Sequence, residues 1–122
     1  MTKVLLVEDD ATMRSLLETL LQIEGFDVAK LVEFNNVIND IRGHAPQVVL
    51  MDVHLEEVDG IELVEELRQD AGLNGVKIIM SSGMDWREKC LEKGANDFIL
   101  KPYMPDELIG KIKLLAGSEQ TL

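Results

Sequence analysis

The sequence has little cysteine and little positive charge, and each shortage excludes a class of protein. A single cysteine, Cys90, cannot form a disulfide within the chain, which favours a reducing compartment and predicts a cytoplasmic location. The 12 lysine and arginine residues are outnumbered by 23 acidic residues, for a net charge of −11. Because such an excess repels phosphate groups, we expect no direct binding to nucleic acid and none to a membrane surface.

Long apolar segments and metal-binding cysteine patterns are lacking as well. The sequence has no apolar stretch long enough to span a membrane, and the apolar run at residues 4–7 is too short for a signal peptide. One cysteine and two separated histidines, His44 and His54, give no zinc-binding spacing. At 122 residues the chain can form one domain with its own core. We expect this domain over residues 1–117, followed by a short tail over 118–122 with no output domain.

Short apolar runs alternate along the chain with longer segments of helical periodicity. The runs are nearly continuous in hydrophobic residues, as strands buried on both faces must be; they lie at residues 4–7, 26–29, 48–51, 76–80 and 98–100. Apolar stripes at helical spacing lie at residues 13–21, 33–42, 61–68, 86–93 and 105–115. Asp10 stands where the first helix would be capped, and Gly25 stands just past its end. The alternation predicts an α/β fold of the doubly wound (βα)5 kind, with a five-stranded parallel sheet and helices on both faces.

Charged and hydroxyl side chains follow four of these runs, where the strands would end. They are Glu8 and Asp9 after the first run, Asp52 after the third, Ser82 after the fourth and Lys101 after the fifth. In open α/β sheets, ligands bind beyond the carboxyl ends of the strands. Two carboxylates about 4 Å apart repel by roughly 4 kcal/mol at an effective dielectric of 20. Three carboxylates and only one ammonium would meet here, so the repulsion among the acids would exceed what the lysine offsets. A cluster of oxygen ligands with net negative charge predicts Mg²⁺, or Mn²⁺ in its place.

The same groups are the parts needed to transfer a phosphoryl group to an aspartate. Asp52 would be the nucleophile, while the cation and Lys101 would neutralise the phosphoryl oxygens. Ser82 would donate a hydrogen bond to one of those oxygens. Gly83, next to Ser82, leaves room for an incoming phosphodonor.

The chain resembles the receiver domain of bacterial two-component response regulators, of the chemotaxis-regulator type. The resemblance covers essentially the whole chain and rests on motifs in the family's order: VLLVEDD at residues 4–10, VVLMD at 48–52, Asp59-Gly60, IIMSSG at 78–83 and GANDFILKPY at 94–103. Each motif alone is weak, whereas all of them in order, each at a strand end, are a strong signal. The resemblance implies the strand order 2-1-3-4-5.

By this resemblance Asp52 is the phosphoacceptor, and a sensor histidine kinase or a phosphotransfer protein donates the phosphoryl group. Asp9 and Asp52 are implied as direct Mg²⁺ ligands and Glu8 as a ligand acting mainly through water. The backbone carbonyl of His54 would complete the protein ligands. The domain would catalyse its own phosphorylation and dephosphorylation, with no turnover on an external substrate.

The resemblance also implies how the phosphoryl group is held and sensed. Ser82, Gly83 and Lys101 would bind it, and the peptide bond between Lys101 and Pro102 would be cis. Phe98 resembles the aromatic switch residue that turns inward as Ser82 moves toward the phosphate. The switched face would serve an output partner that the sequence does not identify, in a monomer or in a phosphorylation-dependent homodimer.

Three features depart from the family pattern. Glu56 stands four positions after Asp52, where relatives often have proline. The segment between Ser82 and Gly94 is shorter than in relatives by roughly one helical turn. Met104 occupies the position that caps the fifth helix, where a polar side chain is favoured.

Three alternatives are weighed against this interpretation. A degenerate receiver would act only as a protein-interaction module. A phosphatase of the haloacid dehalogenase type would need a second acid two positions after Asp52, where His54 stands. A flavodoxin-like cofactor binder would need a hydroxyl- and glycine-rich phosphate loop after the first strand, where the acids from Glu8 to Asp10 would repel the phosphate.

Overall fold

A five-stranded parallel sheet forms the centre of the computed structural model, which describes residues 1–117. The strands are β1 (Lys3–Val7), β2 (Asp27–Lys30), β3 (Val48–Asp52), β6 (Lys77–Ser82) and β7 (Asp97–Leu100). They lie in the order β2-β1-β3-β6-β7, and each neighbouring pair is parallel. With these five strands counted along the chain, this is the expected order 2-1-3-4-5, so that prediction is confirmed.

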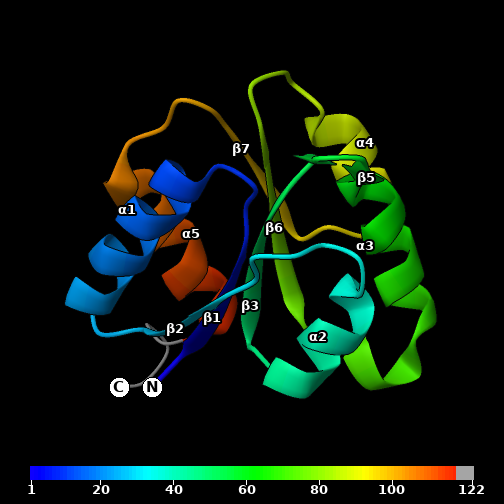
Figure 1. Cartoon of the computed structure of the whole chain (residues 1–122), viewed down its shortest axis with the longest axis horizontal. Coiled ribbons are helices and arrows are strands. Elements are labelled where there is room, and N and C mark those ends of the chain that lie inside the picture. The colour runs from blue at the N-terminus through cyan, green and yellow to red at the C-terminus, as the bar shows by residue number, and fades with distance from the viewer. Residues whose placement is uncertain (118–122) are drawn as a thin grey trace.

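Helices cover both faces of the sheet (Figure 1). One face carries α1 (Ala11–Ile23) and α5 (Pro105–Ala116), and the other carries α2 (Val37–His44), α3 (Gly60–Gln69) and α4 (Arg87–Glu92). A single 3₁₀ turn (Ala71–Leu73) follows α3. The doubly wound (βα)5 architecture is therefore confirmed, and α4 is short, as the spacing between Ser82 and Gly94 predicts.

The side chains of each central strand alternate between two apolar cores. Val49 and Met51 of β3 pack toward α2, α3 and α4, whereas Val48 and Leu50 pack toward α1 and α5. All four are at most 2% exposed. This burial on both faces explains why the strand segments are almost continuously apolar, and it fixes which side chains share a face at the strand ends.

The second helix begins later than the sequence predicts. Its apolar stripe suggests a start near residue 33, but α2 begins at Val37. Phe34 is buried without being helical, at 7% exposure. Asn35 and Asn36 account for the difference, because asparagine side chains compete with helical backbone hydrogen bonds and favour helix starts. Asn36 is the residue before the first turn of α2, and its side chain accepts a hydrogen bond from the Asn39 side chain but none from the helix backbone.

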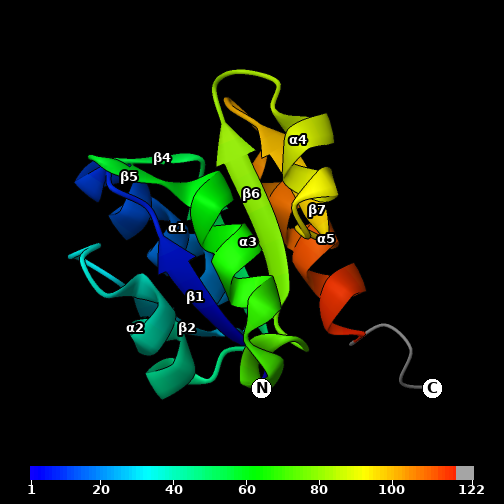
Figure 2. The same cartoon turned by 90° about the vertical axis from the view of Figure 1, so that its right-hand side faces the viewer.

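A small antiparallel hairpin, which the sequence analysis did not predict, follows β3. It consists of β4 (His54–Leu55) and β5 (Val58–Asp59) and lies beyond the carboxyl end of β1 (Figure 2). Gly60 closes it by donating its N–H to the Val53 carbonyl at 2.7 Å. A Cβ at Gly60 would lie 2.2 Å from the Asp52 carbonyl oxygen, so only glycine allows this approach to the end of β3.

Two expectations about the chain as a whole can be placed. Within residues 1–117, none of the helices combines the length and apolar character that crossing a membrane would require. The expected tail at residues 118–122 lies outside the described residues.

Candidate functional site

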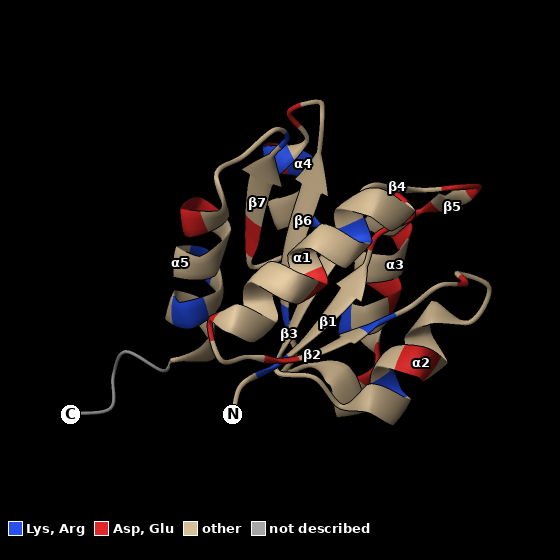
Figure 3. Cartoon of the chain, turned by 60° about the vertical axis from the view of Figure 1, so that its left-hand side comes forward, with Lys and Arg blue, Asp and Glu red and all other residues tan. Residues whose placement is uncertain are grey.

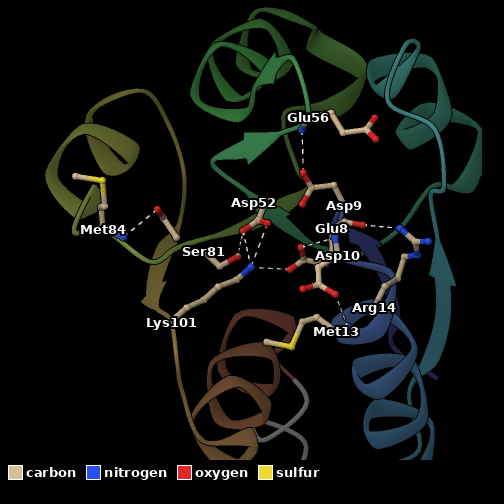
Figure 4. Close-up of polar contacts among 11 residues, drawn as sticks. Glu8, Asp9, Asp10, Met13, Arg14, Asp52, Glu56, Ser81, Met84 and Lys101 are labelled. Atoms are coloured by element: carbon tan, nitrogen blue, oxygen red, sulfur yellow. Dashed lines mark hydrogen bonds and ion pairs between the residues drawn. The ribbon is translucent and has the colours of Figure 1, made fainter.

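The carboxyl ends of β1 and β3 and the segment after β7 bring the predicted acids and the lysine together (Figure 4). Glu8, Asp9 and Asp52 each offer one carboxylate oxygen, and these three atoms lie within 4.8 Å of one another. Lys101 Nζ lies 2.8 Å from Glu8 Oε1 and 3.0 Å from Asp52 Oδ1. The topology thus joins residues as far as 93 positions apart into one charged cluster.

The members of this cluster differ in how deeply they are buried. Glu8 is 3% exposed and Asp52 is 7% exposed, whereas Asp9 is more accessible than either. Burial and the neighbouring Asp52 carboxylate raise the pKa of Glu8, although its hydrogen bond from Lys101 works in the opposite direction. Burial alone would lower the pKa of Lys101, but its hydrogen bonds to Glu8 and Asp52 outweigh burial and raise it. The cluster therefore holds a protonated lysine and more negative charge than that lysine offsets.

The start of α1 holds the Glu8 carboxylate and the backbone around it. The Asp10 N–H donates to Glu8 Oε2 at 3.0 Å, and Arg14 Nη1 donates to the Glu8 carbonyl at 2.7 Å. The Asp10 side chain accepts from the Met13 N–H at 3.0 Å, which is the helix cap that the sequence predicts. The α1 cap is therefore built onto the strand end that carries the acids.

Ser81 contacts Asp52, and this contact was missed in the sequence analysis. The Ser81 hydroxyl donates to Asp52 Oδ1 at 3.0 Å, whereas the predicted phosphate ligand Ser82 accepts a hydrogen bond from the Met84 N–H at 3.1 Å. The strand register explains the contact, because Ser81 pairs directly with Asp52 and paired residues of neighbouring strands share a face. The role of Ser82 in binding phosphate stays a prediction.

The other predicted site residues differ in their burial and in the neighbours that they contact. His54 lies in β4, with an exposed side chain whose ring centroid is 6.5 Å from that of Trp86. Gly83 is exposed, and a Cβ there would meet no atom within 4 Å. Phe98 is 1% exposed, with the Arg87 guanidinium carbon 5.9 Å from its ring centroid. The Lys101–Pro102 peptide bond is cis.

The donor set suits a small, hard cation. All three acids present oxygen atoms, which are the ligands that Mg²⁺ and Mn²⁺ prefer, and the single cysteine is buried in α4 away from them. A divalent cation would also offset the charge excess of three carboxylates facing one ammonium. The chemistry of these residues therefore fits the expected metal.

Comparison with known proteins gives one family. The family model described as the response regulator receiver domain matches residues 4–113. Over 111 residues the chain is 32% identical to the DNA-binding response regulator MtrA of Mycobacterium tuberculosis and 31% identical to MtrA of Mycolicibacterium smegmatis. Each alignment covers 91% of this chain and 49% of the relative. The chain thus spans about half the length of the curated relatives that it matches.

Solved structures of receiver domains are similar over nearly the whole chain. The receiver domain of Francisella response regulator 1452 matches with a TM-score of 0.88 and 25% identity, over 98% of this chain and 99% of that one. The receiver domain of a sensor histidine kinase from Pseudomonas aeruginosa matches with a TM-score of 0.84 and 27% identity, over 95% of this chain and 98% of that one. These matches favour none of the phosphatase, flavodoxin-like or interaction-only alternatives.

Proposed function

The chain belongs to the response regulator receiver domain family, and from that premise we propose that it accepts a phosphoryl group on Asp52 in a Mg²⁺-dependent reaction. The observation that carries this proposal is the environment of the Asp52 carboxylate. Ser81 donates a hydrogen bond to its Oδ1 and Lys101 donates one to its Oδ2, and two further carboxylates lie within reach of a shared cation. A buried aspartate that merely capped a helix would need neither the acids nor the lysine.

The transfer itself requires little of the protein beyond position and charge. An Asp52 carboxylate oxygen attacks the phosphorus of the donor and forms the new P–O bond. The bond between phosphorus and the donor's histidine nitrogen, or the oxygen of a small acyl phosphate, breaks and its electron pair leaves with the donor. Lys101 keeps its positive charge beside Asp52 throughout, because its raised pKa holds the proton on Nζ.

Mg²⁺ is the proposed cofactor, with Mn²⁺ as its substitute. When bound, the cation supplies positive charge against the phosphoryl oxygens. Asp9 and Asp52 would hold it directly, Glu8 mainly through water, and the His54 carbonyl would complete the set. The related Pseudomonas aeruginosa receiver domain is described with magnesium coordinated in its active site cleft, which supports this choice.

The remaining roles follow the family. Receiver domains are signalling domains rather than enzymes that turn over an external substrate, and we propose that this one catalyses only its own phosphorylation and dephosphorylation. The donor would be a sensor histidine kinase or a phosphotransfer protein in the cytoplasm. Ser82, Gly83 and Lys101 would hold the phosphoryl group, and Ser82 and Phe98 would repack in response. The chain covers about half the length of its DNA-binding relatives, and the face that switches would serve an output partner.

The test is intact-mass analysis after incubation with acetyl phosphate and Mg²⁺. We expect wild-type protein to gain the mass of one phosphoryl group, and Asp52→Asn to gain none. Asp27→Asn is the matched control, because Asp27 is an exposed aspartate at the start of β2, at the far end of the sheet from the cluster. Labelling of Asp52→Asn would overturn the assignment. An unlabelled wild-type protein would favour the interaction-only receiver, and release of phosphate from an external monoester would favour the phosphatase.

A further inference from the structure

The turn of the β4–β5 hairpin reaches across to the acidic cluster through its backbone. The Glu56 N–H donates to Asp9 Oδ2 at 2.9 Å, joining residues 47 positions apart (Figure 4). Glu56 has a φ of 54°, in the left-handed region that residues other than glycine seldom adopt. Its side chain is exposed and extends away from Asp9 in the figure. The contact therefore depends on the backbone of Glu56 and not on its carboxylate.

We propose that the Glu56 amide is a positioning group that fixes the Asp9 carboxylate for a cation of the size of Mg²⁺. This inference rests on the proposed function, in which Asp9 is a metal ligand. An N–H that donates to a charged oxygen forms a stronger hydrogen bond than one to a neutral acceptor, so it restrains the carboxylate plane. Groups that orient metal ligands in this way are part of what sets metal affinity.

Proline at this position could not play the same part. A proline ring fixes φ near −65° and removes the N–H, whereas the contact needs a φ of 54° and a donor. The departure of Glu56 from the family pattern thus gives this chain a hydrogen bond to Asp9 that a proline-containing hairpin cannot make. Within residues 1–117, Glu56 is tied to the cluster by its backbone N–H, while its side chain is exposed.

Fixing one oxygen of Asp9 also affects which cation the cluster favours. With Oδ2 engaged by the amide, Oδ1 is the oxygen left to bind a metal, and Asp9 acts through a single oxygen. Mg²⁺ demands an octahedral shell of single oxygens, whereas Ca²⁺ takes six to eight oxygens and often both oxygens of one carboxylate. Release of Oδ2 should therefore weaken Mg²⁺ binding more than Ca²⁺ binding.

The first test is calorimetric titration of the metal-free protein with MgCl₂ and with CaCl₂. For Glu56→Pro we expect Mg²⁺ affinity to fall about tenfold or more, as for the loss of a group that orients a metal ligand, with a smaller loss for Ca²⁺. Glu56→Gln removes the charge and keeps the N–H, and Glu56→Gly keeps the N–H and relieves the strained φ. Both should stay within about twofold of wild type, since an exposed charge contributes little.

Two results of this titration would overturn the inference. One is a Glu56→Pro variant whose Mg²⁺ and Ca²⁺ affinities both match wild type. The other is a Glu56→Gln variant as weak as Glu56→Pro, because the side-chain charge and not the amide would then act on the site. A fall in both affinities by the same factor in Glu56→Pro would mean general damage to the hairpin, and it would also count against the positioning role.

The second test needs no proline and no metal. The hydrogen bond to Asp9 should protect the Glu56 amide from hydrogen exchange, and Asp9→Ala should speed its exchange about tenfold or more. The Gly60 amide is the control, because it donates to the Val53 carbonyl within the same loop and should exchange at the same rate in both proteins. Equal exchange of Glu56 in the two proteins would overturn the inference, even if wild-type protein is phosphorylated on Asp52. A wild-type protein that takes no phosphoryl group but protects Glu56 would instead count against the proposed function alone.

Discussion

Two ion-pair clusters of this molecule look alike in their distances and differ in their charge balance. The strand-end cluster holds three acids and one lysine: Glu8, Asp9, Asp52 and Lys101. The β7 cluster holds one acid and two cations, since Asp97 lies 2.9 Å from Lys111 Nζ and 3.4 Å from Arg87 Nη1. Figure 3 shows the acidic start of β7 beside basic segments of α5. The shortest ion pairs differ by only 0.1 Å, at 2.8 Å and 2.9 Å, although one cluster is acidic overall and the other basic.

The pKa of Glu8 in the strand-end cluster and the pKa of Asp97 in the β7 cluster shift in opposite directions. Burial raises the pKa of Glu8, and the nearby Asp52 adds to the increase. Burial would also raise the pKa of Asp97, but its hydrogen bonds from Lys111 and from the Phe98 N–H outweigh burial and lower it. In the β7 cluster two cations offset the charge of one acid, whereas in the strand-end cluster one lysine faces three acids. Charge balance, and not the presence of a salt bridge, distinguishes the part of the molecule that is ready for a cation.

Addition of Mg²⁺ should separate the two clusters most clearly. At a free Mg²⁺ concentration of about 100 times the dissociation constant, we expect the free energy of unfolding of wild-type protein to rise by about 2.7 kcal/mol. Asp97→Asn should gain the same amount, because the β7 cluster offers no site for a cation. Asp52→Asn should gain much less, because it lacks one of the proposed ligands. Urea unfolding with and without Mg²⁺ measures each gain, and equal gains in all three proteins would place the cation elsewhere.

The sheet and the composition of the site could be predicted from the sequence because both follow from burial. The runs that form β1 and β3 are apolar on both faces, and in a parallel sheet the residues that follow them must meet at one edge. The places of Glu8 and Asp52 in the chain therefore predict that they meet at this edge. The Ser81 contact was also within reach, because period-two alternation places Ser81 beside Asp52 once the strands are paired in register.

The hairpin and its contact with Asp9 could not be predicted in this way. Each strand of the hairpin has only two residues, which is too short for a hydrophobic period to show. The hydrogen bond from Glu56 depends on a positive φ at a residue type that disfavours it. The late start of α2 has a related cause. The apolar stripe includes Phe34, but the helical backbone begins only at Val37. An apolar stripe in a sequence indicates which side chains are buried, and a buried side chain such as Phe34 can lie outside a helix.

Substitution of Asp52 should stabilise the metal-free protein. In Asp52→Asn two repulsions, with Glu8 and Asp9, are lost along with one attraction, to Lys101, and the amide oxygen can still accept from Ser81. We expect a net gain of about 1 kcal/mol in the free energy of unfolding at neutral pH, well below the roughly 4 kcal/mol of a single close pair because water and salt screen the cluster. Urea unfolding without Mg²⁺ gives the value. A loss of stability would mean that the pair with Lys101 dominates and would remove the contrast between the clusters.

The same chemical change at Asp97 should have the opposite sign and the smallest size. In Asp97→Asn the pairs with Lys111 and Arg87 are lost, and because these are partly exposed we expect a loss of about 0.5 kcal/mol at neutral pH. A control at Asp27, which is exposed and takes no part in either cluster, should change the free energy of unfolding by less than this.

The pH dependence of that loss follows from the direction of the pKa shift. The pKa of Asp97 is lower in the folded protein than its usual value of 3.8, so its ionisation stabilises the fold above that value. The contribution is lost as pH falls through the lowered folded pKa, because Asp97 is then protonated in both states. Unfolding curves of wild type and Asp97→Asn should therefore differ by a constant amount between pH 7 and about pH 5 and converge in stronger acid. A difference that grew in acid would mean that the pKa of Asp97 is raised in the folded protein, as the pKa of Glu8 is in the strand-end cluster, and the two clusters would then be alike.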